Sequence, residues 1–248
     1  MSLESSQAVV LNFRPYGELD KIVTVYSEKK GRVTGMAKAA QHSRKRFGGR
    51  LDYFSLVNLY FEEKKRTSLF FFKHVELIEN FESMKSSPLR CAYAGYLCEL
   101  IMKMTPEREG DPSLFNVFKN VLGRLNTELG FKKYIRFFEI FLLKKIGLFP
   151  LLESCLGCQK KISFQEYYDL SFIQGGLYCF SCSQGKKIDW RLEKSVFDFL
   201  RNEPVEIEKL KDPENLKLQD FLHSYFSFQH GYDFKSVRYI KEIEKVYS

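Results

Sequence analysis

The chain has 248 residues, 44% of them hydrophobic, which is enough to build one large core or several small ones. Its net charge of +8 favours a polyanionic partner. No run of about 18 uncharged apolar residues occurs, and residues 1–7 lack a basic segment followed by an apolar one, so neither a membrane span nor a secretion signal is predicted and the cytoplasm is favoured.

Short segments with strand-like alternation open the chain. The spacing predicts strands over 8–13, 22–27, 32–37, 53–61 and 68–79. Turn residues separate them, at Pro15-Tyr16-Gly17 and at the end of the Glu28–Gly31 link. Such a set of short strands within one small region predicts a β-barrel of the oligonucleotide-binding (OB) type over residues 1–82.

The connection 38–50 between the third and fourth predicted strands carries the densest positive charge. No acid lies between Glu28 and Asp52, whereas the interval holds eight Lys and Arg. OB barrels hold single strands with such loops, because cations follow phosphates and aromatic rings stack on bases. The predicted DNA-binding residues are Arg14, Arg32, Lys38, Arg44, Lys45, Arg46, Phe47 and Arg50.

Aromatic residues near this loop have two interpretations. Phe47, Tyr53 and Phe54, with Tyr16 and Tyr60 behind them, are candidates for base stacking. Alternate aromatics in small barrels more often fill the core. The sequence leaves both interpretations open.

Helical spacing begins after Ser86-Ser87-Pro88, a sequence typical of a helix start. Helices are expected over 91–104, 112–125, 131–146, 189–201, 213–226 and 236–246. The third is apolar around most of its circumference and is predicted to lie at the centre of a bundle. Cys91 and Cys98 fit reduced packing residues of the first helix. The expected helical domain comprises 83–150 and 187–248.

Four cysteines interrupt this helical pattern. Cys155, Cys158, Cys179 and Cys182 form two C-x-x-C pairs with the ligand spacing of a closed zinc site, and one structural Zn²⁺ is predicted. A redox pair or disulfides are the alternatives, but they suit a single pair or a short secreted chain. Gly157 frees the first turn and Gly175-Gly176 marks a hairpin, so 151–186 is expected to be an inserted zinc ribbon.

Lysines flank both cysteine turns, at positions 160, 161, 186 and 187. Four thiolates and one Zn²⁺ carry net negative charge, so these lysines either offset the metal site or contact phosphate. The sequence therefore predicts an α+β multidomain chain: an OB-fold barrel and a helical bundle with an inserted four-cysteine ribbon.

This order of parts resembles the bacterial RecO recombination-mediator family, and the likeness covers nearly the whole chain. Similar segments are 8–11 (AVVL), 16–23 (YGELDKIV), 31–33 (GRV), 37–39 (AKA), 43–51 (SRKRFGGRL), 136–139 (RFFE), the cysteine pairs with 175–178 (GGLY), and 235–238 (KSVR). The chain departs from the family at Ala39, where a glycine is usual, and at Gln41-His42, where a more basic pair is usual.

The resemblance implies a non-enzymatic DNA repair and recombination protein that binds single- and double-stranded DNA and anneals complementary strands. It also implies work with RecR and the C-terminal tail of single-stranded-DNA-binding protein (SSB), so that RecA is loaded, in a nucleoid-associated location. We expect the acidic tail of SSB to contact Lys132, Lys133 and Arg136 on the helix over 131–146, although these are equally typical of solvated helix charges.

Two other classes of protein remain as alternatives. A zinc-ribbon transcriptional regulator would read base edges and prefer particular sequences, but no helix-turn-helix or finger motif is present. An enzyme such as a nuclease would need a catalytic cluster, whereas His42, His74, His223 and His230 are scattered and no phosphate-binding loop motif occurs.

Overall fold

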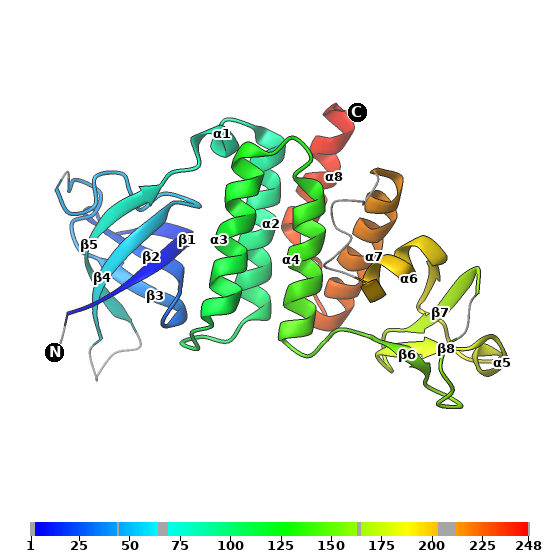
Figure 1. Cartoon of the computed structure of the whole chain (residues 1–248). Helices are drawn as coiled ribbons and strands as arrows, with labels where there is room; N and C mark the ends of the chain where they lie inside the picture. Colours follow the sequence, from blue (N-terminus) through cyan, green and yellow to red (C-terminus); the bar gives the residue numbers. More distant parts are fainter. Residues whose placement is uncertain (1–2, 44, 64–68, 163–164, 203–211, 248) are drawn as a thin grey trace. The chain divides into compact units, whose positions relative to one another are not determined.

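The computed structural model describes residues 3–43, 45–63, 69–162, 165–202 and 212–247. The chain packs as two compact units, which we call unit 1 (1–129 with 235–248) and unit 2 (130–234) (Figure 1). No helix within the described ranges is both long and apolar enough to cross a membrane.

Unit 1 begins with a closed barrel whose strands follow the order β1-β2-β3-β5-β4. Neighbouring strands are antiparallel except β3 and β5, which pair in parallel at Gly35–Ala37. This order confirms the predicted OB-type barrel. The strands are β1 (Glu4–Tyr16), β2 (Asp20–Ser27), β3 (Gly31–Ala37), β4 (Leu56–Glu63) and β5 (Phe70–Glu79).

Alternate residues of these strands fill the barrel, as a period of two requires. β3 shows the alternation without exception, from buried Gly31 to buried Ala37. Residues from the β3–β4 connection complete the same core, namely Ala40, Phe47 and Leu51. The connection is therefore attached to the barrel by apolar side chains.

The helices of unit 1 are α1 (Glu82–Lys85), α2 (Pro88–Met104), α3 (Pro112–Thr127) and α8 (Lys235–Tyr247). The predicted starts are confirmed, because the Ser87 side chain accepts from Arg90 N and the Asp111 side chain accepts from Ser113 N and Leu114 N. Tyr26 of β2 contacts two rings of α3, with centroids 6.4 and 6.2 Å away. The barrel and these helices thus share packed side chains.

Unit 2 joins helices to a small sheet of order β6-β8-β7-β9. Its elements are α4 (Lys132–Lys145), β6 (Leu151–Cys155), β7 (Tyr167–Ser171), β8 (Gly176–Tyr178), α5 (Phe180–Ser183), β9 (Trp190–Glu193), α6 (Lys194–Asn202) and α7 (Asp212–His230).

The prediction of one helix over 189–201 is wrong in its first part. Trp190–Glu193 is a strand that pairs with β7, and the helix begins only at Lys194. Pairing across the sheet places Leu192 opposite Tyr168 and buries both, an interaction distant in sequence that outweighs local helical spacing. The sheet thus extends past residue 186. The division into an OB-fold domain (1–82), a helical domain (83–150 and 187–248) and a ribbon (151–186) stays a prediction.

Candidate metal centre and nucleic-acid surface

The four cysteines of the two C-x-x-C pairs converge in unit 2. All four sulfur atoms lie within 4.8 Å of one another, and the sulfurs of Cys158 and Cys179 are 3.9 Å apart. Tetrahedral zinc thiolate sites, with bonds of about 2.3 Å, require sulfur separations of about 3.8 Å. The cluster therefore fits a four-coordinate ion with no ligand position left for water or substrate.

Tight turns bring these sulfurs together. The Cys155 sulfur accepts hydrogen bonds from Gly157 N at 3.3 Å and Cys179 N at 3.2 Å. A Cβ atom on Gly157 would lie 2.9 Å from the Cβ of Cys182, so the close approach of the two turns requires glycine there.

Hydrogen bonds give the thiols of the cluster different pKa values. Burial raises the pKa of the Cys155 thiol, but N–H donors, first among them Cys179 N, outweigh it and lower the pKa to about 6. Contact with the Cys179 thiol, together with burial, raises the pKa of Cys182 to about 12. Full ionisation of all four thiols thus needs a compensating cation, which suits a metal site.

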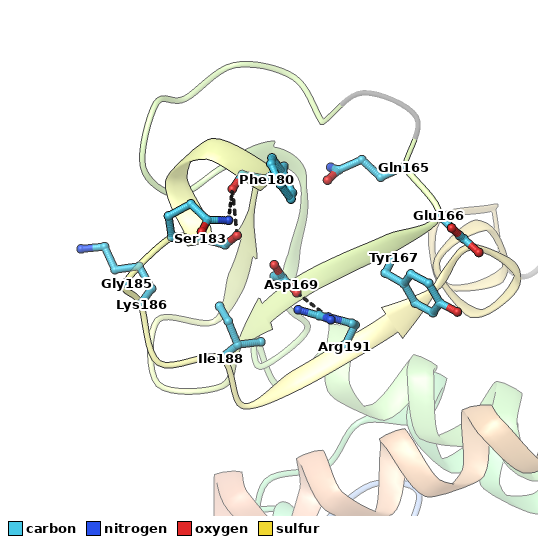
Figure 2. A pocket seen from close by; sticks show the side chains of 11 residues that line it. Gln165, Glu166, Tyr167, Asp169, Phe180, Ser183, Gly185, Lys186, Ile188 and Arg191 are labelled. Carbon is cyan, nitrogen blue, oxygen red and sulfur yellow. Dashed lines mark hydrogen bonds and ion pairs between the residues drawn. The ribbon is translucent and has the colours of Figure 1, made fainter.

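A cleft of about 570 Å³ lies on the same sheet, between α5 and the strands β7 and β9 (Figure 2). The Asp169 carboxylate holds Arg191 Nε at 2.9 Å, and Glu166 and Lys186 lie at the lining as well. These opposite charges balance, so the cleft offers little net attraction to a polyanion.

The basic loop 38–50 is fixed to the barrel from inside. Phe47 is only 1% exposed and occupies the barrel core, while Val75 N donates to Arg46 O at 3.0 Å. Arg46 Nη2 donates to Lys38 O at 2.9 Å, and Ala39 N donates to Asp20 Oδ1 at 2.8 Å. These contacts order the loop without using its positive charge in ion pairs.

Most predicted DNA-binding cations lie at the surface. Arg14, Lys38, Lys45 and Arg46 are exposed. Arg50 is half-buried and directs its Nη1 toward backbone oxygens of the loop and of β5. Arg44 lies outside the described residues.

Two of the predicted DNA-binding residues have structural positions instead. Phe47 is buried, so no base can stack on its ring. Arg32 pairs with Glu107 at 2.9 Å and donates to Thr105 O at 3.2 Å, with its side chain 21% exposed. These contacts link β3 to the segment after α2, so the Arg32 guanidinium already has partners within unit 1.

An aromatic cluster lies on the barrel surface, partly at residues that the sequence did not single out. The rings of Phe13 and Tyr53 are 4.5 Å apart at their centroids, and Phe54 lies 6.0 Å from Tyr53. Lys21 Nζ is 4.4 Å from the centre of the Phe13 ring. Tyr53 is 40% exposed, so the cluster combines an accessible ring with a cation. The β1–β2 hairpin register is the signal that places Phe13 and Lys21 together.

The other two aromatic candidates differ in accessibility. Tyr16 is 49% exposed at the end of β1. Tyr60 stacks on His74 with centroids 3.9 Å apart, and its hydroxyl donates to Glu76 at 3.1 Å. Tyr16 is therefore available to a base, whereas the Tyr60 ring already has a partner.

The expected partner-binding residues on α4 also differ in their exposure to solvent. Lys132 and Lys133 are partly exposed. Arg136 is fully buried and its Nε lies 3.1 Å from Glu139 Oε2, so the expectation that it contacts a partner at the surface is wrong. The Glu139 carboxylate also lies 3.7 Å from His223 Nε2 of α7. These side chains form a buried polar cluster between α4 and α7.

Positive charge concentrates in unit 1. Its sequence contains 24 Lys and Arg and 17 Asp and Glu, a net charge of 24 − 17 = +7, of the +8 carried by the whole chain. The unit that contains the barrel therefore carries nearly all of the chain's excess positive charge.

Comparison with known proteins agrees with this arrangement. The family described as "Recombination protein O N terminal" matches residues 1–81, and "Recombination protein O C terminal" matches residues 85–238. The chain is 30% identical to the DNA repair protein RecO of Pelobacter propionicus, over 98% of both chains. It is 28% identical to that of Syntrophus aciditrophicus (97% of this chain, 96% of the relative) and 27% to that of Listeria monocytogenes (98% and 96%). The chain therefore belongs to the RecO family.

Proposed function

We propose that this chain is a DNA repair protein that binds single- and double-stranded DNA and anneals complementary strands. The observation that carries the proposal is the loop 38–50, which is anchored by buried Phe47 and displays Lys38, Lys45 and Arg46 in a unit of net positive charge. The accessible Tyr53 ring of the Phe13–Tyr53 cluster suits an unpaired base.

Annealing by this surface requires no bond making and no catalytic residue. Cations lower the repulsion between two phosphate backbones, while rings hold bases unpaired until complementary bases meet. Contacts of this kind are individually weak and salt-sensitive, so the paired product is released. The function proposed is non-enzymatic and belongs to a cytoplasmic, nucleoid-associated protein.

The metal proposed for Cys155, Cys158, Cys179 and Cys182 is one structural Zn²⁺. Its chemical contribution is to cross-link two turns of the ribbon. The donor set of four sulfurs excludes a bound water, so no catalytic role is assigned to the ion.

The proposed partners are those of recombination mediation: RecR and the C-terminal tail of SSB, with which the protein helps load RecA on SSB-coated single strands. Lys132 and Lys133 are the cations we propose for the acidic tail, since Arg136 is buried. In fluorescence anisotropy with a labelled tail peptide, Lys132→Glu/Lys133→Glu should weaken binding. An unchanged affinity would remove α4 from the partner surface.

The DNA-binding proposal is tested by reversing charge in the loop. Lys45→Glu/Arg46→Glu should weaken binding to single strands of any sequence, and the log–log salt slope should fall by roughly 0.7 for each lost phosphate contact. The matched control is Lys160→Glu/Lys161→Glu, the same charge change at exposed ribbon lysines, which should bind nearly as the parent does. An equal loss of DNA affinity in both double variants would contradict specific binding of DNA by the loop.

Sequence preference separates a mediator from a regulator. Affinity should vary little among scrambled oligonucleotides, because backbone contacts carry no sequence information. A strong preference for one duplex sequence would instead support a zinc-ribbon transcriptional regulator.

A further inference from the structure

The outward side of α8 carries cations that are separate from the barrel loop. Arg238, Lys241 and Lys245 are exposed and are spaced three and four residues apart, so they lie along one side of the helix. Tyr239, adjacent to Arg238 in sequence and on the flank of the same helix, is 52% exposed. Within the described part of the chain, neither Arg238 nor Lys241 forms an ion pair. We call Arg238, Tyr239, Lys241 and Lys245 the α8 face.

Acidic groups fix α8 from its inner side, and one acid, Glu242, is exposed among the cations of the outer side. The Glu99 carboxylate of α2 is 8% exposed and accepts from Lys235 N at 3.3 Å and Ser236 N at 3.0 Å, which caps the start of α8. Glu244 points inward, where it accepts from the Tyr93 hydroxyl at 2.8 Å. The helix is thus anchored through Glu99 and Glu244, and the outer side, with three cations and Glu242, keeps a net charge of 3 − 1 = +2.

Apolar packing adds to this anchoring. Ile240 is fully buried and Ile243 is 9% exposed, and α8 packs against α2. The α2 helix in turn contacts β1 of the barrel. The α8 face therefore belongs to a packed part of unit 1, on a different element from the basic loop.

We propose that the α8 face binds a second single strand of DNA while the barrel loop holds the first. The chemistry is that of a single-strand platform, in which Arg238, Lys241 and Lys245 contact phosphates and Tyr239 stacks on a base. This inference rests on the proposed function and deepens it, because annealing needs two strands brought together. The half-exposed Tyr239 ring offers a face on which a base can stack next to the Arg238 phosphate contact.

The test measures capture of the second strand. The full-length protein is first saturated with a donor-labelled poly-dT strand, and an acceptor-labelled poly-dT strand is then titrated while energy transfer between the two is recorded. The parent protein should give a saturable signal. Arg238→Ala/Lys241→Ala and, separately, Tyr239→Ala should keep the affinity for the first strand and weaken second-strand capture about tenfold or more.

Controls make each outcome decisive. Glu242→Ala removes an exposed acid from the same helix and should leave second-strand capture unchanged or stronger. Thermal melting confirms that every variant is folded. Unchanged capture in the α8 variants would overturn the inference, as would equal competition by a poly-glutamate peptide, which would assign the face to acidic protein segments. Failure of the parent protein to bind the first strand would instead refute the proposed function.

Discussion

At the level of single residues, Ala39 is the clearest source of backbone strain in the basic loop. Its φ of 55° lies in the left-handed region, which favours glycine, the residue that is usual at this position in the RecO family. Ala39→Gly should therefore raise the free energy of unfolding by about 0.5–1 kcal/mol. Urea unfolding measures the change.

As a matched control, the same substitution at Ala92 should lower the free energy of unfolding. Ala92 lies within α2, where replacement by glycine removes a favourable helix former and should cost about 1 kcal/mol. If Ala39→Gly were as destabilising as Ala92→Gly, the left-handed conformation of Ala39 would be contradicted.

The buried ion pair of α4 makes a second prediction at this scale. Arg136→Met leaves the Glu139 carboxylate buried without its guanidinium, and such a change should cost about 3–5 kcal/mol. The double variant Arg136→Met/Glu139→Leu should recover most of that loss, because it removes both buried charges. Denaturant unfolding of the parent, single and double variants tests it, and a single variant of unchanged stability would contradict the buried pairing.

Burial is the property that the sequence could not supply for individual residues. Phe47 follows a basic run, and the sequence left both base stacking and core packing open for it. Arg136 follows two lysines, and these neighbours indicated a surface position. Phe47 is buried in the barrel core, which is built from strands distant in sequence. Arg136 is buried beside Glu139, three residues further along α4, and the Glu139 carboxylate lies 3.7 Å from His223 of the distant α7. Local charge patterns do not show which charged side chains the packing of other elements encloses.

At the level of elements, Arg32 connects β3 to the segment that follows α2. Arg108 N donates to Arg32 O at 2.9 Å, in addition to the ion pair with Glu107 and the bond to Thr105 O. Arg32→Met should lower the free energy of unfolding by about 1–2 kcal/mol, since it removes a half-buried hydrogen bond and an exposed pair.

The same variant should bind DNA nearly as tightly as the parent protein. Oligonucleotide binding, measured beside Lys45→Glu/Arg46→Glu, checks this expectation. An affinity loss as large as that of the loop variant would show that Arg32 contacts phosphate after all.

Elements were predictable where the determinants are local. The Ser87 and Asp111 caps and the hairpin turn at Gly17, with φ of 59°, follow from a few adjacent residues, and the structure confirms them. β9 was missed because a four-residue edge strand is defined by its pairing with β7. The prediction of the cysteine cluster was confirmed because each C-x-x-C turn is a local unit, and only the pairing of the two turns is distant in sequence.

At the level of the whole molecule, the metal centre and the basic barrel belong to different compact units. Removal of the proposed zinc should therefore lower the stability of unit 2 while the single-strand affinity changes little. Cys158→Ser should release the metal, as measured by a colorimetric zinc assay, and lower the melting temperature. Retained zinc with unchanged melting would refute the structural site, and a parallel loss of DNA affinity would place the ribbon in the DNA surface.

We expect the whole molecule to bring two complementary strands together without making or breaking a covalent bond. The most direct measurement is annealing of complementary fluorescent oligonucleotides without nucleotide, over a series of salt concentrations, with scrambled strands and EDTA as controls. We expect accelerated pairing that tolerates any complementary sequence, weakens as salt rises and leaves both strands intact. No acceleration at low salt, or cleavage of the strands, would contradict the account.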